Sequence, residues 1–166
     1  MFESSQGRQC KVLNYRTLVE YRIPCYNGYM DKQEKYRYWL DIAEYDLATA
    51  EDMNRSARWL YVAFMCQQAI EKLVKGLYVL YVDEDVPRVH NISQIINRYA
   101  DQLSEDVPES YYVLFEKLTS FYIAGRYPKY KDTVSKLLDK KEAEGLLKQT
   151  KEVFAWLLTM KPSIGQ

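Results

Sequence analysis

Residues 57–82 read ARWLYVAFMCQQAIEKLVKGLYVLYV, and this stretch decides the fold. Its first half is apolar nearly all round, because residues 59, 60 and 62–65 are Trp, Leu, Val, Ala, Phe and Met. The apolar stripe then continues at helical spacing through Ile70, Leu73, Val74, Leu77 and Leu80. A helix that is apolar on every side is buried on several faces. The pattern therefore predicts that residues 57–82 form the central helix of a bundle.

Helical periodicity continues on both sides of this stretch. It predicts further helices over residues 31–53, 91–103, 108–125 and 140–160. Ser56 is expected to cap the central helix, and Asp139 with Glu142 has the spacing of a capping box at the last one. The short connector before residue 57 favours an antiparallel hairpin. The predicted fold class is all-α, an up-and-down antiparallel helical bundle of about five helices.

The two ends of the chain differ from this pattern. Residues 1–30 hold Gly7, Pro24 and Gly28 and show no sustained helical period. They are expected to be an N-terminal extension, either flexible or upstream of the true start at Met30. The alternative is that residues 12–23 form a strand or a short helix that docks on the bundle. The bundle itself is expected to span residues 31–161, with a tail at 162–166.

Composition excludes several classes of protein. Lys plus Arg and Asp plus Glu both number 23, so the chain lacks the broad basic field of a non-specific nucleic-acid binder, and RNA is the less favoured partner. No apolar run approaches the roughly 20 residues of a membrane span, and no signal peptide is evident, so a cytoplasmic location is expected. Cys10, Cys25 and Cys66 form no CxxC pair, which argues against a zinc site or a disulfide framework. Cys66 is expected to be a buried thiol.

Polar side chains interrupt the central helix at one point. Gln68, Glu71, Lys72 and Lys75 are three or four residues apart and are predicted to share a face. Such groups are costly on an apolar helix unless they are paired. One interpretation is structural, with Glu71 paired to Lys75 and Gln68 bonded to a neighbouring helix. The other is a lysine-lined groove for phosphates or for the acidic residues of a partner.

Two further places carry candidate residues. His90, the single histidine, is predicted either to cap the helix that follows it or to bond a buried carboxylate. Gly125 is predicted to end the preceding helix in a left-handed conformation, so that Arg126 emerges there with Tyr127 beside it. An arginine beside an aromatic ring suits phosphate, carboxylate or base recognition. It equally suits a buried ion pair of Arg126 with Asp46 or Glu71.

In combination these stretches resemble the HEPN family of small helical proteins. The resemblance rests on DIAEYDLA at residues 41–48, QAIEK at 68–72 with Lys75, HNI at 90–92 and RYP at 126–128, and it covers about residues 31–158. It implies a homodimeric helical bundle. Family members often act as partners of a minimal nucleotidyltransferase in toxin–antitoxin-type modules, and nucleotide binding has been proposed for them.

Some branches of that family are metal-independent ribonucleases that use an arginine followed by four to six residues and a histidine. This sequence departs from that pattern, because the positions that should hold histidine after Arg126 are Lys131, Asp132 and Thr133. We therefore expect a non-catalytic protein without metal or cofactor. It is expected to bind itself and either a nucleotidyltransferase or a nucleotide.

The residues expected at the binding site are Glu71, Lys72, Lys75, His90, Tyr122, Arg126 and Tyr127. Lys75 and Arg126 would meet phosphate or carboxylate, and Tyr122 and Tyr127 would stack or shape the wall. Two alternatives stay open. One is a ribonuclease site formed across the dimer from Arg126, His90 and Tyr127, and the other is a purely structural helical scaffold.

Overall fold

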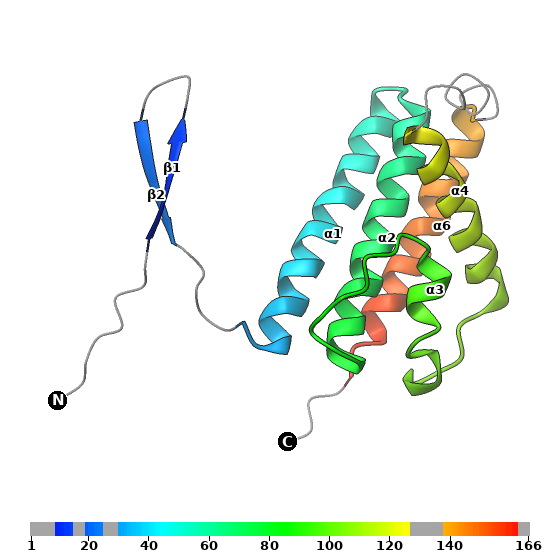
Figure 1. Ribbon diagram of the computed structural model, residues 1–166. Coiled ribbons are helices and arrows are strands. Elements are labelled where there is room, and N and C mark those ends of the chain that lie inside the picture. Colours follow the sequence, from blue (N-terminus) through cyan, green and yellow to red (C-terminus); the bar gives the residue numbers. More distant parts are fainter. Residues whose placement is uncertain (1–8, 15–18, 25–29, 127–137, 163–166) are drawn as a thin grey trace. The chain divides into compact units, whose positions relative to one another are not determined.

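The computed structural model describes residues 9–14, 19–24, 30–126 and 138–162, and their side chains over 30–122 and 138–162 (Figure 1). The chain divides into two compact units, Met1–Asp31 and Lys32–Gln166. The first contains a β-hairpin of β1 (Gln9–Asn14) and β2 (Val19–Pro24), paired antiparallel with Val12 opposite Tyr21. Of the two alternatives for residues 12–23, the structure therefore shows strand rather than helix, and it shows two paired strands rather than one.

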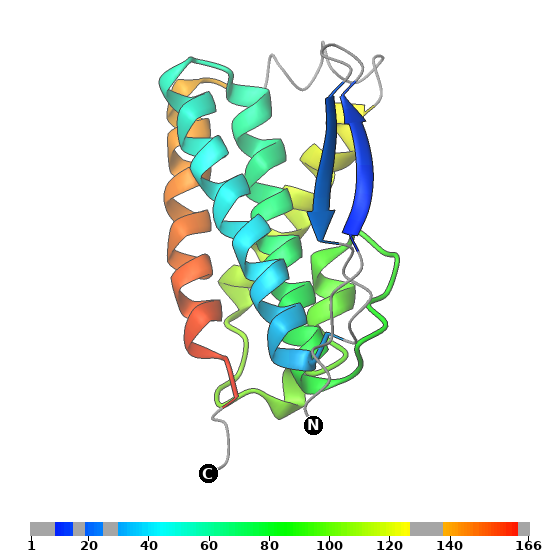
Figure 2. The same cartoon turned by 90° about the vertical axis from the view of Figure 1, so that its left-hand side faces the viewer.

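The second unit is the predicted all-α bundle. Its long helices are α1 (Lys32–Arg55), α2 (Trp59–Tyr81), α4 (Glu109–Arg126) and α6 (Lys140–Thr159). A short helix α3 (Ile92–Ile96) and a 3₁₀ turn η1 (Ala100–Gln102) lie between α2 and α4. Both views show α1 and α2 as an antiparallel pair with α6 beside them (Figures 1 and 2). Among the described residues, no helix is long and apolar enough to span a membrane.

Helix α2 is the centre of the bundle, as its sequence predicts. It contacts α1, α3, α4 and α6. Burial is nearly continuous from Val62 to Val79, and Ile70, Leu73 and Leu77 are fully enclosed. Each apolar side chain of this size that leaves water contributes about 1.5–3 kcal/mol, so α2 supplies much of the stabilisation of the fold. Of the polar residues that interrupt it, Gln67, Glu71 and Lys75 are consequently held in the interior.

The structure corrects three local predictions. The helix expected over 91–103 ends at Ile96, because Tyr99 turns into the core, where its hydroxyl donates to the Val74 carbonyl oxygen at 2.8 Å. Ser56 does not cap α2. Its N-cap is Arg58, which makes no side-chain cap, and the connector turns at Ala57 with a positive φ of 54°. Gly125 does not end α4, which continues to Arg126.

The capping box predicted at α6 is confirmed in the bond of the Asp139 side chain, whereas the Glu142 carboxylate pairs with Lys117. The Asp139 carboxylate accepts a hydrogen bond from the Glu142 amide at 2.8 Å, satisfying one of the free N–H groups of the first turn. Asp139→Ala is expected to lower the free energy of unfolding by about 1 kcal/mol. Urea denaturation measures this. A variant as stable as the wild type would show that the cap contributes nothing.

The Cys66 thiol is enclosed in the core, and burial raises its pKa to about 12. The unfolded thiol ionises near 9.0. The contribution of Cys66 to stability is therefore complete below pH 9 and is lost as the pH rises towards 12. In a Cys10→Ser/Cys25→Ser variant, Ellman's reagent at about pH 8 is expected to label Cys66 only as fast as the protein unfolds, since the reactive species is the thiolate. Labelling within minutes under native conditions would contradict this assignment.

Candidate functional site

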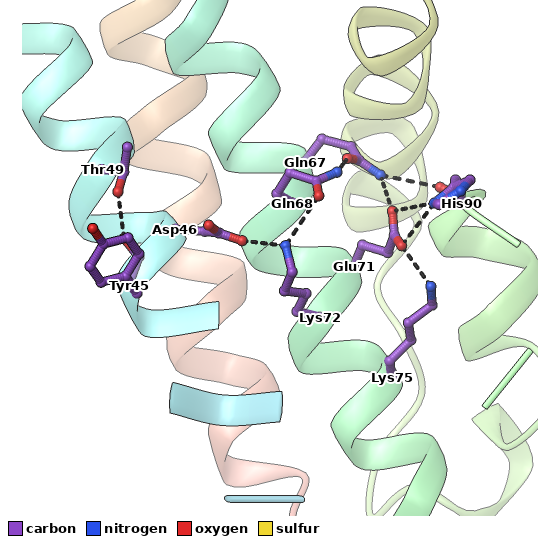
Figure 3. A network of polar contacts seen from close by, with 9 residues as sticks. All are labelled: Tyr45, Asp46, Thr49, Gln67, Gln68, Glu71, Lys72, Lys75 and His90. Carbon is purple, nitrogen blue, oxygen red and sulfur yellow. Dashed lines mark hydrogen bonds and ion pairs between the residues drawn. The ribbon is translucent and has the colours of Figure 1, made fainter. Parts of the chain in front are cut away.

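Glu71 of α2 is the acceptor at the middle of a buried polar network (Figure 3). Only 6% of its side chain is exposed. Lys75 Nζ donates to Glu71 Oε1 at 2.7 Å, and Gln67 Nε2 donates to Glu71 Oε2 at 2.7 Å. Both donors are on α2, one turn after and one turn before the glutamate. The predicted pair of Glu71 and Lys75 is thus present, and it is almost fully removed from water.

His90 joins this network from the segment that leads into α3. Its Nδ1 lies 3.1 Å from Glu71 Oε1 and 3.3 Å from Glu71 Oε2. Gln67 Nε2 also donates to the backbone oxygen of His90 at 3.2 Å, which fixes the position of the segment. Of the two roles predicted for His90, the contact with a buried carboxylate is confirmed. The helix cap belongs to Asn91, whose side chain accepts from the Gln94 amide.

Tyr122 of α4 packs against one face of the His90 ring. The two ring centroids are 4.8 Å apart with the planes tilted by 34°. Tyr122 is buried and also stacks on Phe64 of α2, with centroids 6.0 Å apart and planes nearly parallel. The His90 side chain remains 47% exposed. The result is an imidazole at the surface, held by a buried carboxylate at one edge and by an aromatic ring at one face. We call His90 together with Tyr122 the His90–Tyr122 site.

Lys72 does not belong to this site. Its ammonium forms an ion pair with Asp46 of α1, and it donates to Gln68 Oε1 at 3.1 Å. Gln68 in turn donates to Gln67 and makes no described bond to a neighbouring helix. Figure 3 shows Lys72 directed towards α1 and Lys75 towards His90. The predicted shared face is therefore divided into two parts, joined by the two glutamines.

Arg126 and Tyr127 are the remaining predicted site residues. Arg126 is the last residue of α4, and only its backbone is described. The Arg126 side chain and the whole of Tyr127 lie outside the described residues. Asp46 and Glu71, the partners considered for Arg126, are paired with Lys72 and Lys75.

Three residues in or beside the network were not among the predicted site residues. Gln67 is fully buried and takes part in three hydrogen bonds of the network, and its position four residues before Glu71 was the available signal. Trp39 of α1 lies beside Lys75, whose Nζ is 5.8 Å from the ring centroid. Phe64 extends the aromatic stack below Tyr122. Nothing in their sequence context separates Trp39 and Phe64 from ordinary core residues.

Charge in the network is balanced pair by pair. Glu71 neutralises Lys75, and Asp46 neutralises Lys72, so neither lysine is available as an unpaired cation. Within the described part of the chain, no group of three His, Cys, Asp or Glu side chains could hold a metal ion. A separate hollow of about 180 Å³ lies between α4 and α6 and shares no residue with the network; its lining is Ser110, Tyr111, Leu114, Gln149, Glu152 and Val153.

Comparison with known proteins shows to which family this helical bundle belongs. The family model for the HEPN domain matches residues 36–160, which include every residue of the network. The chain belongs to the HEPN family. No match was found among curated proteins.

Two solved structures resemble this HEPN protein along most of its length. TT1696 from Thermus thermophilus is 25% identical with a TM-score of 0.66, and the match covers 76% of this chain and 98% of that one. ST0689, an archaeal HEPN homologue, is 22% identical with a TM-score of 0.58 and the same two coverages. The fold is therefore shared with these proteins over nearly their whole length.

Proposed function

We propose that this HEPN protein is a non-catalytic homodimeric binding module. In this proposal the His90–Tyr122 site binds a nucleotide, or a minimal nucleotidyltransferase partner in a toxin–antitoxin-type module. The observation that carries the proposal is the construction of the site. A buried carboxylate and a buried aromatic ring hold an imidazole that is itself 47% exposed. A histidine with a purely structural role would not need a buried carboxylate and a buried aromatic ring to hold a side chain that faces water.

His90 is the exposed ring of this cluster and favours a ligand with a flat, partly apolar group, whereas Tyr122 is buried against Phe64 and His90 and supports the imidazole. Aromatic side chains contribute about 1–3 kcal/mol for each base that stacks on them. Lys75 acts differently from the sequence-based expectation, since it is almost fully buried and neutralises Glu71. We assign to Lys75 and Glu71 the positioning of His90 rather than direct contact with a ligand.

Thermal shift with ATP, GTP and their analogues tests nucleotide binding. A ligand that binds only the folded state at about 100 times its Kd adds about 2.7 kcal/mol to the free energy of unfolding. We expect a raised midpoint for the wild type and for Arg98→Ala, an exposed control, and no ligand effect in His90→Ala. No shift at millimolar nucleotide would remove this half of the proposal. A large stability loss in His90→Ala, without any ligand effect in either protein, would favour the scaffold.

Co-expression with a minimal nucleotidyltransferase from the same genome tests the partner half. We expect the two chains to co-elute, and we expect His90→Ala to weaken the complex while the Arg98→Ala control leaves it intact. Sedimentation of the protein alone is expected to give the mass of a homodimer. A monomer that fails to retain the nucleotidyltransferase would contradict the proposal.

One observation also favours a second candidate, a metal-independent ribonuclease. A carboxylate that holds one nitrogen of a histidine, as Glu71 holds His90 Nδ1, is the arrangement found behind general bases. Incubation with single-stranded and structured RNA decides between the two functions. Under the leading proposal, RNA stays intact. Cleavage that His90→Ala and Arg126→Ala both abolish would establish the ribonuclease instead.

A further inference from the structure

The ring nitrogen that His90 turns towards Glu71 must carry the proton. The Glu71 carboxylate already accepts from Lys75 and from Gln67, so it acts as an acceptor on both oxygens. An ionised carboxylate has no proton to donate. The contacts of 3.1 and 3.3 Å with His90 Nδ1 are therefore Nδ1–H to carboxylate hydrogen bonds. This fixes which of its two neutral tautomers the imidazole adopts.

The other ring nitrogen is consequently an acceptor. A neutral imidazole has one proton, so Nε2 keeps its lone pair when Nδ1 is protonated. Nε2 has no protein partner in the described part of the chain, and the side chain is 47% exposed. The site thus offers water or a ligand a fixed hydrogen-bond acceptor on a ring that packs against the buried Tyr122.

The surrounding charges do not turn this acceptor into an anion site. Lys75 is neutralised by Glu71 and Lys72 by Asp46. A phosphate oxygen has no proton to donate to Nε2 at neutral pH. The phosphate oxygen and Nε2 would therefore face each other with lone pairs, which repel. A neutral N–H or O–H donor avoids this repulsion and gains a hydrogen bond.

From this geometry we propose that His90 Nε2 binds a hydrogen-bond donor of the ligand, a sugar hydroxyl or a base amino group, and that the phosphates lie elsewhere. The inference rests on the proposed function, because it assigns the nucleoside end of the nucleotide to the His90–Tyr122 site. It makes Glu71 a specificity-determining positioning residue, which acts by fixing the tautomer of His90.

The first arm of the test concerns the protein without ligand. His90 is the only histidine in the sequence, so a long-range ¹H–¹⁵N spectrum of the labelled protein at about pH 8 reports a single imidazole. We expect a protonated, pyrrole-like Nδ1 and a pyridine-like Nε2. The opposite tautomer would overturn the inference whatever the protein binds. In Glu71→Gln, whose amide can orient either way, a weaker preference for the Nδ1–H tautomer is expected.

The second arm compares ligands by titration, with the Nε2 signal as the readout. Adenosine and ATP are expected to shift it. Loss of one hydrogen bond is expected to weaken binding about tenfold. If a sugar hydroxyl is the donor, 2′,3′-dideoxyadenosine shows this loss. If the base amino group is the donor, inosine shows it. Inorganic triphosphate that moved the Nε2 signal as ATP does would overturn the assignment. If no nucleotide binds, the nucleotide half of the proposed function fails, while the tautomer found in the first arm is unaffected.

Discussion

Glu71→Ala is expected to lower the free energy of unfolding by about 3–5 kcal/mol. The change removes the acceptor shared by Lys75, Gln67 and His90. Lys75 would then keep a buried ammonium without a counter-charge, since its side chain is only 8% exposed. For a chain of this length, such a loss corresponds to a fall in the melting temperature of roughly 6–20 °C. Thermal and urea denaturation both measure it.

A matched control uses a glutamate in the same kind of pair at the surface. Glu144 is 3.8 Å from Lys140 in an i,i+4 pair on α6, with both side chains largely exposed. Glu144→Ala is expected to change stability by less than about 0.5 kcal/mol. The double variant Glu71→Leu/Lys75→Leu is expected to recover most of the loss, because it removes both buried charges together. Equal losses in Glu71→Ala and Glu144→Ala would show that the buried network does not stabilise the fold.

Gly76→Leu is expected to destabilise the protein by about 3 kcal/mol, through overpacking between α1 and α2. A β-carbon at Gly76 would lie 3.1 Å from the Trp39 β-carbon and 3.3 Å from the Tyr36 ring. The Trp39 β-carbon is attached directly to the backbone of α1, so the two helices must separate to admit a larger side chain. Urea denaturation measures the loss, and Gly76→Ala is expected to lie between leucine and the wild type.

The matched control for this change is Gly145 in the second turn of α6. A β-carbon there meets nothing within 4 Å, and the residue is exposed. Gly145→Leu is expected to stabilise the protein by up to about 0.8 kcal/mol, because leucine has the better helix propensity. Similar effects of leucine at the two glycines would show that α1 and α2 are not in close contact at Gly76.

The fold was predictable because its strongest signals are local. Residues 59–65 are apolar around the whole helix, so no polar face is left to contact water. This pattern identifies α2 as the central helix without any knowledge of its neighbours. The Asp139 cap likewise depends on residues three positions apart. The end of α3 was not predictable in this way. It depends on Tyr99 reaching the Val74 carbonyl, a contact between residues 25 positions apart.

The residues of the candidate site could be predicted from the sequence better than the contacts between them. His90 and Glu71 were recognisable as polar residues that need partners, and each proves to be a partner of the other. Helical spacing alone did not separate Lys72 from Lys75, which are three positions apart. Which neighbouring helix each lysine faces depends on tertiary packing, with Asp46 of α1 on one side and His90 on the other.

The central claim, that ligand meets this HEPN protein at the His90–Tyr122 site, is tested most directly by mapping backbone amide signals of ¹⁵N-labelled protein during addition of ATP. The account predicts that the perturbed amides cluster at residues 67–75 of α2, at 90–92 and at 118–122 of α4. Perturbations centred instead on the hollow between α4 and α6, at Ser110, Gln149 and Glu152, would contradict it. A spectrum that does not change at millimolar ATP would contradict nucleotide binding altogether.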